Sequence, residues 1–217
     1  MENMKNRVAF LFDLDGVIID TESQYNVFWN KMGTVYQLGI NNFEQQVKGI
    51  PLSNIISRYF SHLPEETQRQ IAADSRTFDA QMDIIAVPGA LEFLAELKKT
   101  GRKTGLVTSS DDEKLATVFR ALPIKGFFDT IVSADRITFG KPHPQCYLLA
   151  ADDLNAAPED CFVFEDSFNG IRAGNAAGMK VIGLATTNPP DSIRKDCICV
   201  IPDFQHFHDT CQSTFFA

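Results

Sequence analysis

Two carboxylates stand two positions apart near the start of the chain, in the segment Phe-Asp-Leu-Asp-Gly at positions 12–16. Side chains at positions i and i+2 of a strand point the same way, so Asp13 and Asp15 can converge where a strand ends. Gly16 then allows the backbone to turn sharply or to approach a ligand closely. Acidic pairs are also common at turns, so this pair by itself predicts a functional site no better than a structural one.

Three hydroxyl residues, Thr108, Ser109 and Ser110, end a second apolar run at 104–108. Hydroxyl groups of this kind are suited to holding the oxygen atoms of a phosphate. The structural alternative is that Ser110 or Asp111 caps the helix that follows, and the two roles are compatible.

A lysine and a second acidic pair complete the set. Lys141 offers a compact positive charge to a phosphate, although a lysine before proline is usually solvated. Glu165 and Asp166 end the strongly apolar run 161–164. Carboxylates in such a place cost free energy unless they are compensated, and a divalent cation is their natural partner. The structural alternative for Asp166 is an N-cap of the helix predicted to begin near Asn169.

The elements that must position these residues alternate between short apolar runs and amphipathic stretches. This alternation predicts an α/β fold, a doubly wound and Rossmann-like core around a parallel sheet. The predicted strands are 8–12, 104–108, 130–133, 161–165, 181–184 and 198–201. The predicted helices between them are 90–99, 113–122, 145–154 and 169–177. Ligands bind beyond the C-terminal ends of such strands, so we expect the acids, hydroxyls and lysine to meet at one sheet edge.

One stretch, from about 21 to 83, breaks the alternation, because it contains helical patterns at 23–36, 52–59 and 65–81 and no predicted strand. An insert of this size predicts a small helical domain after the first strand. The predicted boundaries are 20–84 for this domain, with 1–19 and 85–217 forming the catalytic core.

The composition excludes some classes of function. A formal charge of −8 on 217 residues disfavours nucleic-acid binding, and no apolar run is long enough to span a membrane. The five cysteines, without a secretion signal, are predicted to be reduced thiols. Cys197 and Cys199 are predicted to be strand residues on one face. We therefore expect a cytoplasmic protein that acts on a small molecule, and a monomer is the default expectation.

The segments described above match, in order, four motifs of the haloacid dehalogenase superfamily. They are Phe-Asp-Leu-Asp-Gly-Val at 12–17, Val-Thr-Ser-Ser at 107–110, Gly-Lys-Pro-His-Pro at 140–144 and Phe-Glu-Asp-Ser-Phe-Asn-Gly at 164–170. The helical insert, with Asp-Thr-Glu at 20–22 and Trp29 in its first helix, resembles the cap of one group in this superfamily. That group contains β-phosphoglucomutase and many sugar-phosphate phosphatases.

The resemblance implies a role for each catalytic residue. Asp13 would attack phosphorus and form an aspartyl-phosphate. Asp15 would protonate the leaving oxygen and then deprotonate the incoming water or hydroxyl. Thr108 and Lys141 would hold the phosphoryl oxygens and offset their charge.

The resemblance also implies a Mg²⁺ cofactor. Its oxygen ligands would be the Asp13 carboxylate, the Asp15 carbonyl, Asp166 and water, with Glu165 as a further candidate ligand. A small phosphorylated metabolite, bound in part by Ser109, Gly16 and cap residue Lys48, is the expected substrate. A cap loop lysine is equally consistent with simple solvation.

Phosphatase and mutase share the aspartyl-phosphate and differ in what accepts the phosphoryl group. Compared with the mutase, this chain has Tyr25 in place of a histidine and Leu52 in place of an arginine. A mutase must hold a second phosphate, and the loss of that arginine removes a bidentate contact. The sequence therefore favours a phosphatase, with a phosphosugar mutase as the second candidate.

Other classes fit less well. A phospho-receiver domain has its lysine last, whereas here Glu165 and Asp166 follow Lys141, and a helical insert is foreign to it. A non-catalytic protein that binds phosphorylated ligands is a further alternative, against which the complete motifs speak. A nicotinamide enzyme is disfavoured, because Asp-x-Asp-Gly replaces a glycine-rich phosphate loop.

Overall fold

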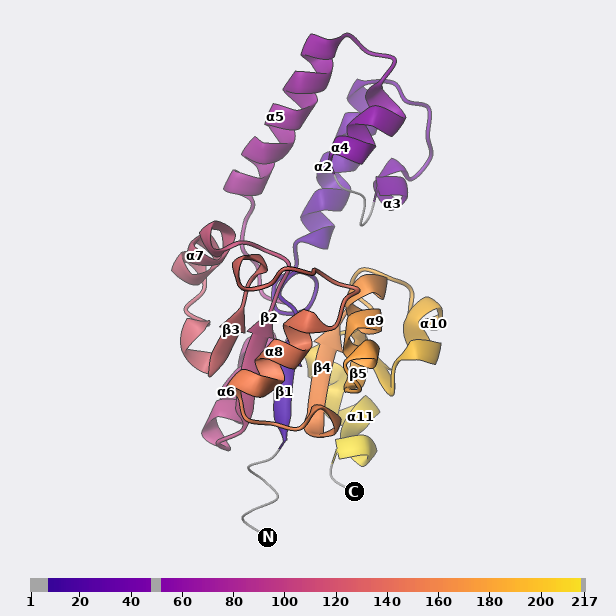
Figure 1. Ribbon diagram of the computed structural model, residues 1–217. Helices are drawn as coiled ribbons and strands as arrows, with labels where there is room; N and C mark the ends of the chain where they lie inside the picture. The colour runs from indigo at the N-terminus through magenta and orange to yellow at the C-terminus, as the bar shows by residue number, and fades with distance from the viewer. Residues whose placement is uncertain (1–7, 48–51, 216–217) are drawn as a thin grey trace. The chain divides into compact units, whose positions relative to one another are not determined.

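The computed structural model describes residues 8–47 and 52–215 (Figure 1). The chain divides into two compact units. One comprises Met1–Asp20 with Ile84–Ala217, and the other comprises Thr21–Asp83.

Six parallel strands form one sheet in the first unit, in the order β3-β2-β1-β4-β5-β6. They are β1 (Ala9–Phe12), β2 (Lys103–Val107), β3 (Thr130–Val132), β4 (Cys161–Glu165), β5 (Lys180–Leu184) and β6 (Cys199–Ile201). The chain runs from β1 outward through β2 to β3 and then crosses back to β4, on the other side of β1. This confirms the predicted α/β class and makes the C-terminal end of β1 the switch point at which such sheets bind ligands.

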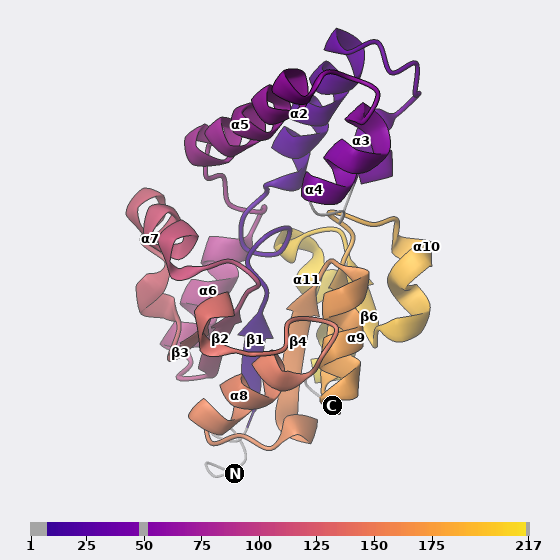
Figure 2. The same cartoon turned by 45° about the horizontal axis from the view of Figure 1, so that its top comes forward.

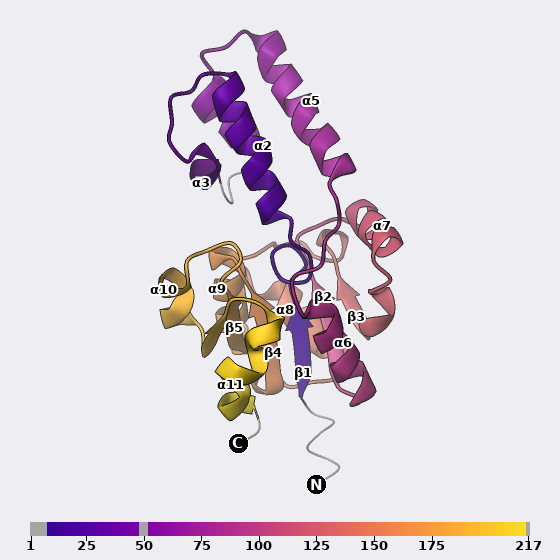
Figure 3. The same ribbon diagram turned by 180° about the vertical axis from the view of Figure 1, so that it is seen from behind.

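Helices cover both faces of this sheet, which explains why its strands are almost continuously apolar. The helices of this unit are α6 (Ala90–Lys99), α7 (Asp112–Ala121), α8 (Gln145–Asp153), α9 (Phe168–Ala176), α10 (Pro190–Ile193) and α11 (Phe207–Phe215). Residues of α6, α7 and α11 share one buried cluster, and α6 and α11 are in view from behind in Figure 3. Residues of α8, α9 and α10 share the other, and α8 and α9 lie before the sheet in Figure 1.

The two strands that carry the acidic motifs also carry stacked phenylalanines on one face. The rings of Phe12 in β1 and Phe164 in β4 stack with centroids 4.7 Å apart. Phe93 of α6 and Phe207 of α11 pack against Phe164 from the same side. Because Phe12 precedes Asp13 and Phe164 precedes a glutamate, this packing fixes the backbone from which the site projects.

Among its described residues, the second unit contains helices joined by turns and loops, and no strand. It contains α2 (Glu22–Val35), α3 (Phe43–Val47), α4 (Leu52–Ile55), a π-helical turn (Ile56–Phe60) and α5 (Glu65–Gln81). Figure 2 shows α3 beside α2. Phe28, Trp29, Phe43 and Phe60 form a separate aromatic core, so this unit has its own hydrophobic interior.

The structure corrects the prediction that all five cysteines are free thiols. Cys199 and Cys211 form a disulfide with their Cα atoms 6.2 Å apart, which joins β6 to α11. The reason is tertiary, because α11 packs on the sheet face to which Cys199 points. Cys146, Cys161 and Cys197 are free.

The prediction that Cys197 and Cys199 share one strand face is also wrong. Cys197 packs with the α8–α9 cluster, whereas Cys199 packs with the α6–α11 cluster. The chain bends at Cys197 and β6 begins at Cys199, so the two-residue period of a strand does not apply to this pair. Among the described residues, no helix is long and apolar enough to cross a membrane.

Candidate active site

Asp13 is the first residue after β1, at the centre of the sheet. Its backbone N–H donates to the carbonyl of Phe164 at 3.1 Å, which extends the pairing of β1 with β4 by one residue. Gly16 then turns the chain with φ +75°, and a Cβ atom at this position would overlap the carboxylate of Asp166. Gly16 thus permits both the turn and the close approach of the second acidic motif.

Lys141 brings the motifs together through its ammonium group. Its Nζ lies 2.6 Å from Oδ1 of Asp13, 2.7 Å from Oε1 of Glu165 and 3.1 Å from the carbonyl of Val107. The lysine side chain is only 7% exposed. Burial by itself would lower the pKa of Lys141, but the two carboxylates outweigh it and hold the pKa well above its ordinary value. Lys141 is therefore a fixed positive charge.

The carboxyl group of Asp13 titrates far from its ordinary range. Burial raises the pKa of Asp13 to about 7, with a further rise from Glu165 and an opposing effect of Lys141. A cation beside this carboxylate would favour its ionised form.

The carboxylate of Glu165 is completely buried and accepts five hydrogen bonds. Oε1 accepts from the ammonium of Lys141 and from the hydroxyl of Tyr147. Oε2 accepts from the backbone N–H of Asp166 and from both the backbone N–H and the hydroxyl of Ser167. Burial raises the pKa of Tyr147 well above its ordinary value, and Glu165 adds to this, so its hydroxyl remains a donor. The donors on both oxygens of Glu165 suit it to anchoring Lys141.

Asp166 lies beside this network and is held by residues that follow β5. The hydroxyl of Thr187 donates to Oδ2 of Asp166, and the side-chain amide of Asn188 donates to the carbonyl of Asp166 at 2.8 Å. Asp166 is not the N-cap of α9, as the structural alternative proposed. Ser167 caps that helix by accepting from the N–H of Gly170 at 3.0 Å.

The three acids fit a divalent cation. Oxygen atoms of Asp13, Glu165 and Asp166 all lie within 4.8 Å of one another. Three carboxylates gather here around the single charge of Lys141, and an excess of buried negative charge is what a cation compensates. Carboxylate oxygen is the donor type that Mg²⁺ prefers.

The hydroxyl residues after β2 lie at the same strand end. Thr108 is 2% exposed, and its hydroxyl oxygen accepts from the N–H of Ser110 at 3.0 Å. Ser109 is exposed, and Asp111 caps α7 by accepting from the N–H of Lys114 at 2.8 Å. The structural alternative for Asp111 is thus confirmed. Lys48 lies outside the described residues.

The residues of this region that were not among the predicted site residues include two on a loop and two on helices. Thr187 and Asn188 follow the predicted strand 181–184, so the strand-end argument could have found them. Tyr147 and Lys114 lie on helices, where their sequence context resembles an ordinary core tyrosine and an ordinary solvated lysine. Only the packing of α7 and α8 reveals them.

Residues 8–178 match the family model of the haloacid dehalogenase-like hydrolases. The chain belongs to this family. The expected superfamily is thereby confirmed, and the chain is an enzyme of the hydrolase type.

Similar members of the haloacid dehalogenase-like hydrolases carry both phosphatase and mutase names. Hexitol phosphatase A of Escherichia coli is 31% identical over 86% of this chain and 86% of its own. The β-phosphoglucomutase of Bacillus subtilis is 30% identical over 83% of this chain and 84% of its own. The crystal structure of β-phosphoglucomutase from Clostridium difficile has a TM-score of 0.65 and 28% identity, covering 90% of this chain and 91% of that one. Overall similarity therefore does not separate the two activities.

Proposed function

We propose that this haloacid dehalogenase-like hydrolase is a Mg²⁺-dependent phosphatase that acts on a small phosphorylated metabolite, a sugar phosphate or polyol phosphate. The observation that carries the proposal is the contact of Lys141 with both Asp13 and Glu165, beside the carboxylate of Asp166. A nucleophilic carboxylate, a fixed cation and a group of metal-binding oxygens are the parts that phosphoryl transfer requires.

The reaction proceeds in two displacements at phosphorus. A carboxylate oxygen of Asp13 forms a bond to phosphorus while the bond to the leaving oxygen breaks, and Asp15 gives its proton to that oxygen. Water then attacks phosphorus, its proton passes to Asp15, and the bond between Asp13 and phosphorus breaks. Inorganic phosphate leaves, and both aspartates return to their starting state.

Asp13, Asp166 and the carbonyl of Asp15 are the proposed ligands of Mg²⁺, with Glu165 close enough to join them. When bound, the cation neutralises charge on the phosphoryl oxygens. Lys141 supplies a second positive charge on the side of Glu165, and Thr108 and Ser109 offer hydroxyl groups to the phosphoryl oxygens. Gly16 leaves room for the substrate beside the backbone.

The helical unit, proposed as the cap, supports a phosphatase over a mutase. A pocket of about 230 Å³ within this unit is lined in part by Glu22, Glu44 and Asp79, and its described lining residues include no lysine or arginine that could bind a phosphate. Tyr25, which replaces the mutase histidine, donates its hydroxyl to Asp79 at 2.7 Å. Leu52, which replaces the mutase arginine, lies in the same apolar core as Trp29.

The substrate class rests on the named relatives. Hexitol phosphatase A and, at 28% identity, a phosphorylated carbohydrates phosphatase of Thermotoga maritima carry names that describe phosphorylated polyols and sugars. The action of this chain as a cytoplasmic monomer, without nucleic acid or membrane partners, stays a prediction.

The test is release of inorganic phosphate from a panel of sugar phosphates, hexitol phosphates, pyrophosphate and p-nitrophenyl phosphate, with and without Mg²⁺. We expect Mg²⁺-dependent release from wild type and none from Asp13→Asn. β-Glucose 1-phosphate belongs in the panel, and glucose 6-phosphate is measured in parallel. Formation of glucose 6-phosphate without free phosphate would identify a mutase. Tight binding of these ligands without turnover would instead indicate a non-catalytic binding protein.

A further inference from the structure

Asp15 is held by two side chains, and no predicted role links either of them to this carboxylate. The ammonium of Lys114 lies 2.8 Å from both carboxylate oxygens of Asp15, across a sequence separation of 99 residues. The hydroxyl of Ser110 donates to Oδ2 of Asp15 at 3.1 Å. Asp15 is thus tied to the loop after β2 and to the first turn of α7.

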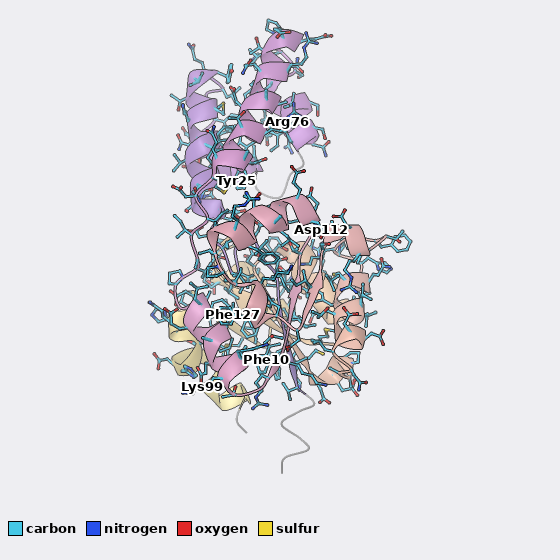
Figure 4. The ribbon with its side chains drawn as sticks, turned by 90° about the vertical axis from the view of Figure 1, so that its left-hand side faces the viewer. Phe10, Tyr25, Arg76, Lys99, Asp112 and Phe127 are labelled. Atoms are coloured by element: carbon cyan, nitrogen blue, oxygen red, sulfur yellow. A yellow bond between two sulfur atoms is a disulfide. The ribbon has the colours of Figure 1, made fainter. Side chains whose placement is uncertain are left out.

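The backbone that carries these two donors is itself anchored. The N–H of Asp112, at the start of α7 (Figure 4), donates to the carboxylate of Asp135 at 2.9 Å. The side chain of Asp111 caps the same turn through the N–H of Lys114. The carbonyl of Ser110 accepts from the N–H of Ala134 at 3.0 Å. Lys114 and Ser110 therefore extend from fixed positions toward Asp15.

An ordinary ion pair would be the simplest explanation of this contact. The side chains of Lys114 and Asp15 are 39% and 31% exposed, and pairs this exposed contribute little to folding stability. An ammonium that contacts both oxygens nevertheless restricts the rotation of a carboxylate, and proton transfer depends on that orientation. The contact therefore bears on the orientation of the Asp15 carboxylate more than on the free energy of folding.

We propose that Lys114 and Ser110 are positioning residues that hold the Asp15 carboxyl group in the orientation for proton transfer. The inference rests on the proposed function, in which Asp15 protonates the leaving oxygen. It predicts that Lys114 and Ser110 increase kcat/KM most for substrates whose leaving oxygen must be protonated. An alkoxide leaving group needs that proton, whereas p-nitrophenolate departs without it.

The test compares Lys114→Met with wild type on p-nitrophenyl phosphate and on the alkyl phosphate that wild type hydrolyses fastest. We expect kcat/KM for the alkyl phosphate to fall by about tenfold to a hundredfold and that for the aryl phosphate to fall far less. Lys114→Arg should restore most of the loss, because a guanidinium also binds both oxygens of a carboxylate. Ser110→Ala should show the same leaving-group pattern with a smaller loss.

The matched control is Lys98→Met, which removes another exposed lysine paired with an aspartate, Asp129, at 3.3 Å. It should leave both rates unchanged. In an Asp15→Asn background, Lys114→Met should add no further loss. Equal losses on the two substrates, or a full additional loss in that background, would overturn the inference. Activity in Asp13→Asn would instead overturn the proposed function, so the two failures are distinguishable.

Discussion

The hydroxyl of Tyr147 donates to Oε1 of Glu165 at 3.0 Å, inside a region where both side chains are fully buried. The same oxygen accepts from Lys141 at 2.7 Å. Tyr147, which lies on α8 and is buried, therefore shares its acceptor atom with the ammonium group of Lys141. Its role is to complete the donors around a buried charge.

Replacing Tyr147 with Phe removes that donor without a large change in volume. We expect the free energy of unfolding to fall by about 1.5–3 kcal/mol, because a buried carboxylate loses a hydrogen bond. Phosphate release should fall as well, since Glu165 anchors Lys141. Urea denaturation and steady-state kinetics provide the two measurements.

The control for this change is Tyr59→Phe, which removes the longer bond of an exposed hydroxyl to the carbonyl of Gln46 at 3.4 Å. It should cost less than about 0.5 kcal/mol. Equal stability of the two variants would show that Tyr147 does not support Glu165.

Thr187→Val tests the support of Asp166. The hydroxyl of Thr187 donates to Oδ2 of Asp166, and removing a partner of a metal ligand commonly costs about tenfold to a hundredfold in affinity or activity. We expect the Mg²⁺ concentration for half-maximal phosphate release to rise by about tenfold. Chelation with EDTA should abolish activity in both proteins, and added Mg²⁺ should restore it.

Thr77→Val is the matched control, because its hydroxyl bonds only to a carbonyl one turn earlier on α5, among the contacts described for it. Its Mg²⁺ requirement should equal that of wild type. An unchanged requirement in Thr187→Val would argue against Asp166 as a ligand.

The disulfide between Cys199 and Cys211 should stabilise the sheet edge. It closes a loop with a sequence separation of 12, for which the loss of loop entropy in the unfolded chain corresponds to about 3 kcal/mol. We expect Cys199→Ser to lower the free energy of unfolding by about this amount. Wild type should lose similar stability in dithiothreitol, whereas the variant should not respond. Equal unfolding midpoints of wild type with and without reductant would contradict the bond.

The pair of Asp153 and Arg136 gives a pH dependence of stability. A hydrogen bond from Arg136, with one from Thr130, holds the pKa of Asp153 below its ordinary value. The folded state therefore binds this proton less tightly than the unfolded state. The resulting stabilisation is complete above the unfolded pKa of about 3.9 and is lost as the pH falls through the folded pKa.

Asp153→Asn should consequently lower stability at pH 7, by less than about 1 kcal/mol because the pair is partly exposed. The difference from wild type should shrink as the pH is lowered below about 4. Thermal unfolding of both proteins at pH 7 and at a pH below about 4 measures this difference in stability. A difference that grows toward low pH would contradict the assigned direction.

Much of the core could be predicted from the sequence. All six predicted strands occur, and β4 (Cys161–Glu165) and α6 (Ala90–Lys99) have the predicted bounds. Strands buried on both faces leave a short apolar run with no alternation, and amphipathic helices leave a period near 3.6, so both patterns are local. Within the second unit, α5 (Glu65–Gln81) also has the predicted bounds.

Shorter elements escaped prediction for a related reason. Helices α3 (Phe43–Val47) and α10 (Pro190–Ile193) contain five and four residues, too few to show a helical period. Helix α11 (Phe207–Phe215) is absent from the predicted helices, although its Phe207 packs in the core.

The sequence by itself determined the fold class, the family and the segments that carry the chemistry, because these depend on patterns within a few residues of each other. The tertiary structure decided which side chains meet. Lys114 reaches Asp15, Tyr147 reaches Glu165 and Cys199 reaches Cys211 only because α7, α8 and α11 pack on the sheet in one rotation and register. That rotation is set by many weak contacts across the core, and no local pattern records it.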